Sequence, residues 1–146
     1  MKKRFVAFIL TALTIISVSI PTTAHAEDVT PRASAYFAAT GIYPVALGNG
    51  MIKFEIDMAA THSMEDLGAS VVHIYEEQTD GTFLEVETYR KETSYWLLEH
   101  NTAFAYVNAY YIGIPGRQYY AIVGFYAKDA SGNETLYFTS KLVTAT

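Results

Sequence analysis

The chain of 146 residues contains no cysteine. This absence excludes disulfide bonds, thiolate metal ligands and a cysteine nucleophile. A domain of about 120 residues buries roughly two-thirds of the surface of its unfolded chain, so apolar packing alone can stabilise it. A small exported protein without disulfides is more typical of bacteria than of animals.

Long apolar runs are also scarce, and the single one, residues 5–20, lies near the N-terminus. Three basic residues precede it, Pro21 follows it, and small residues flank position 25, as in the cleavage site of a secretory signal peptide. The run is shorter than the roughly twenty residues that a membrane-spanning helix needs. We therefore expect residues 1–26 to be a signal peptide removed after Ala26. The alternative is an uncleaved membrane anchor.

The residues after the predicted cleavage site are polar. Residues 27–34, "EDVTPRAS", are expected to be a flexible tail, and Arg32 offers a trypsin-like protease a place to trim it. A passive tail is the simpler interpretation. Residues 35–146 are then expected to fold as one domain, which is secreted and has no membrane insertion once the signal peptide is removed.

Basic residues are few. The predicted mature chain has seven Lys and Arg against fifteen Asp and Glu, a net charge of −8. Nucleic acids and anionic lipid headgroups bind basic proteins, because affinity there comes largely from Lys and Arg near phosphate. Neither is an expected partner, and the negative charge is most simply a solubility feature of a secreted protein. The oligomeric state stays open.

Segments of helical periodicity are absent, whereas alternating apolar and polar residues recur between turn signals. A short helical turn is expected at 62–68, and 92–101 is expected to be a crossing loop that inserts Trp96 and Leu97 into the core. The pattern predicts an all-β fold, an antiparallel β-sandwich of about seven strands. The expected strands are 34–43, 51–59, 69–77, 83–91, 103–112, 118–128 and 134–143.

The stretch "GRQYYAIVGFYAKDASGNE" combines a turn glycine, an early tyrosine, alternating apolar residues and a second glycine turn. It resembles the penultimate strand of immunoglobulin-like and fibronectin-type-III-like sandwiches. With "TPRAS" and "MEDLGASVVHIYEE", the chain also resembles a family of small secreted Gram-positive proteins of unknown function. The resemblance implies a β-sandwich and export. It brings no catalytic residues.

Catalytic and metal-binding motifs are missing. His62, His73 and His100 lack the spacing of a zinc site, and no Gly-x-Ser-x-Gly turn presents a nucleophile. Asp129 and its neighbours resemble a calcium loop weakly, because Gly132 comes before the third ligand position. We therefore expect no enzyme activity, no catalytic residue, no metal and no cofactor. A small hydrolase that uses strand-borne acids is the weakest alternative.

Tyrosine is concentrated in residues 105–127, and alternation assigns the tyrosines to faces. In 118–128 the odd positions are expected to face the core, which buries Tyr119 and exposes Tyr120. In 103–112 Asn108 marks the outer face. The inward set is then Ala105, Val107, Ala109 and Tyr111, and the outward set is Phe104, Tyr106 and Tyr110. In the hairpin of 69–91 the inward set is Val72, Ile74, Leu84 and Val86.

If the hairpin and the last two strands share a sheet, five tyrosines lie on one outer face with a histidine and two acids. Ring faces would take the C–H side of a pyranose, and the polar neighbours would take its hydroxyls; tyrosine is also common in protein hot spots. The predicted ligand-binding residues are Tyr75, Tyr89, Tyr120, Tyr126, His73, Glu85 and Glu87, with Tyr137 beside them.

Three interpretations follow from this face. The leading hypothesis is a non-enzymatic extracellular binding module for a glycan or a cell-surface protein. The alternative is a secreted effector or bacteriocin-like toxin. A third is that the tyrosines serve the fold alone, because tyrosine favours strands and forms good cross-strand pairs without any ligand.

Overall fold

The computed structural model describes residues 34–146. The predicted signal peptide, 1–26, and the predicted tail up to residue 33 lie outside the described residues. Ser34, the last residue assigned to the tail, is held in place. Its hydroxyl donates to the Glu134 carboxylate and accepts the backbone N–H of Phe37 at 2.7 Å.

Seven strands and one short 3-10 helix make up the described chain, and the strands are antiparallel. The elements are β1 (Phe37–Gly48), β2 (Met51–Glu77), β3 (Phe83–Arg90), η1 (Tyr95–Leu97), β4 (Leu98–Ile112), β5 (Gln118–Asp129), β6 (Gly132–Thr139) and β7 (Val143–Thr144). The predicted all-β fold and the number of strands are confirmed.

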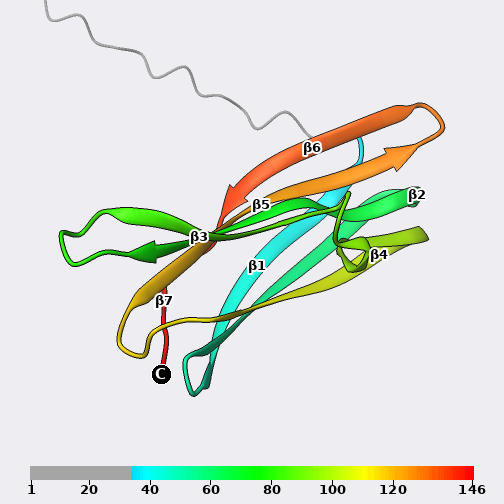
Figure 1. Ribbon diagram of the computed structural model, residues 1–146. Coiled ribbons are helices and arrows are strands. Elements are labelled where there is room, and N and C mark those ends of the chain that lie inside the picture. Colours follow the sequence, from blue (N-terminus) through cyan, green and yellow to red (C-terminus); the bar gives the residue numbers. More distant parts are fainter. Residues whose placement is uncertain (1–33) are drawn as a thin grey trace, which may run out of the picture. The chain divides into compact units, whose positions relative to one another are not determined.

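The long strand β2 belongs to both layers of the sandwich. Its first part, 51–60, lies between β1 and β4, and its last part, 71–77, lies between β3 and β5. One continuous sheet therefore folds over on itself, and its two halves face each other in Figure 1. The hairpin strands and the last two long strands share one layer, in the order β3-β2-β5-β6, which is the condition for the tyrosine face that was considered above.

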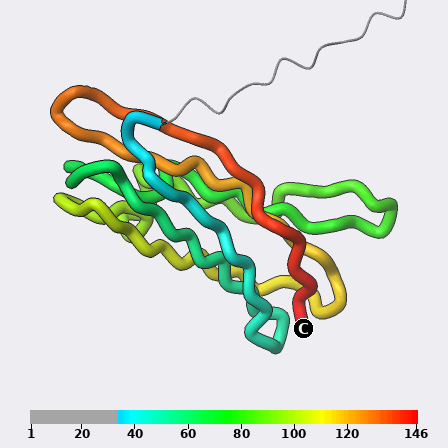
Figure 2. Tube along the Cα trace, turned by 180° about the vertical axis from the view of Figure 1, so that it is seen from behind, coloured from blue at the N-terminus to red at the C-terminus, as the bar shows by residue number. Residues whose placement is uncertain are grey.

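The core lies between the two layers. Phe54 and Ile56 of one layer and Val123 and Phe125 of the other are fully buried. In the interior, the rings of Phe37 and Phe125 pack edge to face, with centroids 6.5 Å apart. Figure 2 shows β1 alongside β7 and the C-terminus, where Gly50 donates to the Thr146 carbonyl at 2.8 Å.

The predicted helical turn at 62–68 is wrong, because these residues belong to β2. Met64 and Leu67 are buried in the core, and burial of their side chains outweighs the local preference for a turn. Gly68 ends no helix. It lets β2 pass close to the crossing chain, since a Cβ atom there would lie 1.9 Å from the Leu97 carbonyl oxygen.

The crossing segment was half predicted. Leu97 is fully buried, as expected, but Trp96 is 40% exposed. The 3-10 turn explains the difference, because consecutive side chains of so tight a turn point in different directions. Trp96 packs edge to face against Tyr89, with ring centroids 5.3 Å apart.

The alternation in β5 and β4 is confirmed. Every odd position from Tyr119 to Ala127 is fully buried, and Ala105, Val107 and Ala109 are buried in β4. Phe104, Tyr106 and Tyr110 are exposed. In the hairpin, Val72 and Ile74 are fully buried and Val86 is half-buried; Leu84 lies opposite the buried Glu76 and so points to the inner side, as predicted, but it is 58% exposed. Leu84 pairs with Glu76 near the end of a hairpin that extends beyond the other layer.

Candidate binding surfaces on the two faces of β3

A β-bulge in β3 decides which side chains share a face. Ile74 pairs with Glu87, and the next residue, Tyr75, pairs with Glu85, so Val86 has no partner in β2. Side chains directly opposite one another in antiparallel strands point to the same face. The bulge therefore shifts the alternation of β3 by one residue.

This shift corrects two predicted positions. Tyr89 pairs with Val72, and Glu87 pairs with Ile74, and both partners are fully buried on the inner face. Tyr89 and Glu87 thus lie on the inner side of β3, not on the outer tyrosine face. Glu85 remains on the outer face, because its partner is Tyr75.

Three aromatic side chains meet on the outer face of the β3-β2-β5-β6 layer. Tyr75 and Tyr120 are register partners, and their rings stack with centroids 4.9 Å apart and planes within 10°. Phe83 from the hairpin approaches Tyr120 edge to face, also at 4.9 Å. Tyr75, Phe83 and Tyr120 are called the aromatic platform below. Phe83 and Thr88 were missed as members of this site.

A polar cluster borders the platform. Glu85 accepts hydrogen bonds from the Thr88 hydroxyl and from the Tyr75 hydroxyl, the latter at 3.2 Å. Nδ1 of His73 lies 3.2 Å from the same carboxylate and 3.1 Å from the Thr88 hydroxyl. The Thr88 hydrogen bond, followed by His73 and Tyr75, lowers the pKa of Glu85. Burial, followed by the bond to Glu85, raises the pKa of Tyr75. At neutral pH the ionised Glu85 carboxylate thus stands beside the neutral Tyr75 phenol.

Tyr126 and Tyr137 point to the same outer face and differ in access. Tyr126 is only 8% exposed, because the Lys91 side chain covers it with Nζ 3.6 Å from the ring centroid. Tyr126 therefore packs within the fold, and the prediction that it is an accessible binding residue is wrong. Tyr137 is 63% exposed and lies against Gly124, where a Cβ atom would be 3.0 Å from its ring.

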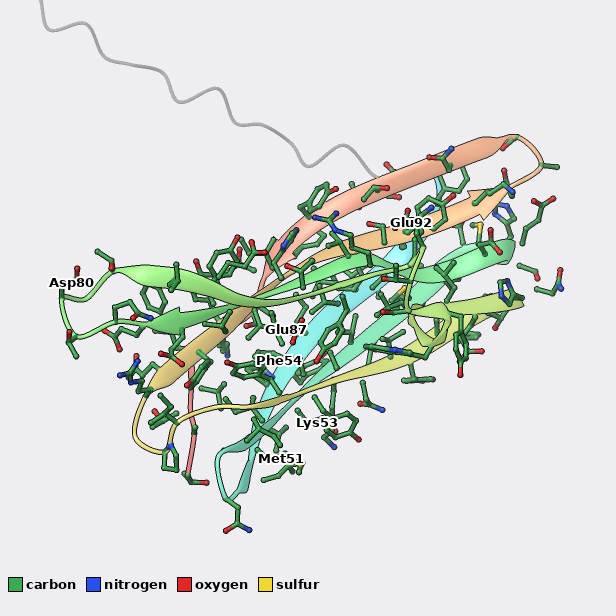
Figure 3. The ribbon with its side chains drawn as sticks, viewed as in Figure 1. Met51, Lys53, Phe54, Asp80, Glu87 and Glu92 are labelled. Carbon is green, nitrogen blue, oxygen red and sulfur yellow. The ribbon has the colours of Figure 1, made fainter. Side chains whose placement is uncertain are left out.

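The inner side of β3 faces β4 across a groove of about 480 Å³. Glu87 and Tyr89 line it from β3, and Figure 3 shows Glu87 on the part of β3 that lies over the other layer, away from Asp80 at the hairpin tip. The Tyr89 hydroxyl reaches across and donates to the Tyr110 carbonyl at 2.8 Å. This β3–β4 groove is lined by Met51, Glu87, Tyr89, Tyr110, Tyr111 and Ile112.

A buried polar network supports the floor of this groove. The Tyr119 hydroxyl donates to Glu76 at 2.6 Å and accepts the Ile114 N–H at 2.8 Å, and Arg117 pairs with the same carboxylate. The Tyr119 hydrogen bond is the largest cause of the lowered pKa of Glu76. Burial, with that bond, raises the pKa of Tyr119 to about 12. Tyr111 lies above it, with ring centroids 5.6 Å apart.

The other layer also carries aromatic side chains on its outer face. Tyr43 is 55% exposed, Phe104 60% and Tyr106 67%. They border a shallow depression of about 230 Å³ together with Asp57. No aromatic contact joins these three rings within residues 34–146, so this face lacks the stacked arrangement of the platform.

Asp129 has a structural role in the β5–β6 turn. One carboxylate oxygen accepts from the Ser131 N–H, the Ser131 hydroxyl and the Gly132 N–H, and the other lies 2.8 Å from Nε2 of His62. The Ser131 hydroxyl and His62 lower the pKa of Asp129 to about 2. The polar residues of this loop thus bond to one another. Within residues 34–146 no three His, Cys, Asp or Glu side chains are grouped to hold a metal ion.

No family model matches the chain, and no curated protein matches it. Among the described residues, no helix has the length and apolar character needed to cross a bilayer.

Proposed function

We propose that this protein is an exported, non-enzymatic binding module that takes an extracellular glycan at the aromatic platform. Export rests on the signal-peptide pattern of residues 1–26. The observation that supports binding is the Tyr75–Tyr120 stack beside the ionised Glu85.

The chemistry of the platform favours a sugar. Aromatic rings offer apolar surface to the C–H side of a pyranose, and buried ring area dominates the energetics of such contacts. Glu85, Thr88 and the Tyr75 hydroxyl already form hydrogen bonds that fix their positions, so few rotamers are lost when a ligand binds. The Glu85 side chain is 44% exposed, so its carboxylate can accept hydrogen bonds from sugar hydroxyls.

The test is a glycan array probed with the purified protein, followed by binding measurements on variants. Tyr75→Ala with Tyr120→Ala removes the stack, and we expect at least a tenfold loss of affinity for any glycan that the protein selects. The matched control is Tyr106→Ala, which removes an exposed strand tyrosine from the other layer. Circular dichroism establishes that both variants stay folded. Undiminished binding by the folded double variant would contradict the proposal.

A further inference from the structure

The β3–β4 groove contains a carboxylate without a cationic partner. Glu87 accepts the N–H of Thr88 at 2.9 Å through one oxygen, and its other oxygen makes no hydrogen bond within residues 34–146. None of the ion pairs of these residues involves Glu87, whereas Glu76 nearby is neutralised by Arg117. The groove therefore carries a net negative charge.

Aromatic rings lie beside this charge. Tyr89 and Tyr111 line the groove, Tyr110 accepts the Tyr89 hydroxyl through its backbone carbonyl, and Trp96 packs edge to face on Tyr89. Glu87 and both phenols line the same groove. Burial raises the pKa of Tyr89 and of Tyr111; the Glu87 charge adds to the first shift, and the charges of Glu76 and then Glu87 add to the second, so both phenols stay neutral. Neutral ring faces and a carboxylate both attract positive charge.

The composition of the groove selects the kind of cation. A calcium ion takes six to eight oxygen ligands, and one carboxylate among apolar rings does not supply them. An organic cation with an apolar shell loses little hydration and gains contact with ring faces. Met51 and Ile112 offer further apolar surface for such a shell. We propose that the β3–β4 groove binds a quaternary ammonium group, with Glu87 opposite the charge and Tyr89 and Tyr111 against its methyl groups.

An added peptide strand fits the groove less well. The free edge of β4 would have to present an unbroken row of backbone groups to such a strand. The Tyr89 hydroxyl already occupies the Tyr110 carbonyl of that edge.

Choline chloride is the probe, and Trp96 is the reporter, because it is the chain's single tryptophan and packs on Tyr89. At constant ionic strength we expect a saturable change in tryptophan fluorescence with choline. The neutral isostere 3,3-dimethylbutan-1-ol should bind at least tenfold more weakly. Equal titration midpoints for choline and the neutral isostere, or a fluorescence change that does not saturate with choline, would contradict the proposed site.

Variants on β3 locate the charge. Glu87→Gln keeps the shape of the side chain and removes its charge, and we expect about a tenfold loss of choline affinity. Glu85→Gln is the matched control on the opposite face of the same strand and should bind choline as the native chain does. Equal choline affinity in the folded Glu87→Gln variant would refute the assignment, as would a loss confined to Glu85→Gln.

Discussion

Tyr119 and Tyr120 are neighbours in β5 and face opposite sides of the same layer. Tyr119 is fully buried and bonded to Glu76 and to the backbone, whereas Tyr120 stacks on Tyr75 at the outer surface. Two residues of one type, adjacent in sequence, thus have different roles because a strand alternates. The number of tyrosines therefore says little about binding. What matters for each ring is which face of the sheet it lies on and whether other side chains cover it.

Tyr126 is an exception to this contrast, because it points to the outer face as Tyr120 does but is covered by another side chain. We expect Tyr126→Ala to lower the free energy of unfolding by about 3 kcal/mol, because truncating a large buried aromatic side chain leaves a cavity. Tyr120→Ala should cost about 1 kcal/mol, mainly its stacking contact. Urea unfolding of both variants measures the difference. Equal costs would mean that Tyr126 is no better packed than Tyr120.

Phenylalanine substitutions sharpen the contrast at the hydroxyl. Tyr119→Phe leaves the Ile114 N–H and one oxygen of Glu76 without their partner, and we expect it to cost about 2 kcal/mol. Tyr120→Phe should change the free energy of unfolding by less than about 0.5 kcal/mol, as surface substitutions usually do. If Tyr119→Phe also lowered the free energy of unfolding by less than about 0.5 kcal/mol, the hydrogen bonds of Tyr119 to Glu76 and Ile114 would not stabilise the fold.

The pH dependence of stability tests the same network. The pKa of Tyr119 rises from 10 to about 12 on folding, so between these values the folded state binds more protons than the unfolded state. The free energy of unfolding should therefore fall as pH rises through this window. Tyr119→Phe should flatten that fall. An alkaline profile of the same slope in the variant would exclude Tyr119 as its source.

The acid side has the opposite sign. The pKa of Glu76 is lowered on folding, first by the bond from Tyr119, so its contribution is present above the ordinary value of 4.5 and lost as pH falls below it. Glu76→Gln should reduce the acid sensitivity of the unfolding free energy between neutral pH and pH 3. An unchanged acid slope in this variant would remove Glu76 from the account.

The smallest expected effect compares the two acids of β3. Glu85→Gln weakens the contacts to Thr88, His73 and Tyr75 and should cost about 0.5–1 kcal/mol, in the range of surface ion pairs. Glu87→Gln removes no ion pair of the described chain and should leave stability within about 0.5 kcal/mol of the native value. Thermal melts at matched pH distinguish these outcomes. A larger cost for Glu87→Gln would mean that its charge contributes to folding.

Much of the fold follows from alternation and turn residues. The buried odd positions of β5 and the exposed aromatic residues of β4 were predictable, because each of these strands is continuous and alternates regularly within its own layer. Residues 62–68 were not, because their polar side chains resemble a turn while tertiary contacts extend them into β2. Burial of Met64 and Leu67 is a long-range effect that local patterns do not contain.

The candidate sites show the same limit. His73, Tyr75, Glu85 and Tyr120 were correctly placed on one outer face, because β2 and β5 pair without a shift from His73 to Tyr75 and Glu85 comes before the bulge, opposite Tyr75. Tyr89 and Glu87 were misplaced, because the bulge at Val86 leaves no clear sequence signal and reverses every position beyond it. Access to Tyr126 depended on Lys91, which follows the end of β3 and covers the ring, a contact that the strand pattern does not contain.

The most direct measurement of the central claim is an NMR titration of the ¹⁵N-labelled protein with the glycan that the array selects. If the aromatic platform is the binding surface, the amide shifts will concentrate in residues 73–75, 83–88 and 118–122, over three neighbouring strands of one layer. Shifts concentrated instead around Tyr43, Phe104 and Tyr106, on the outer face of the other layer, would contradict the account.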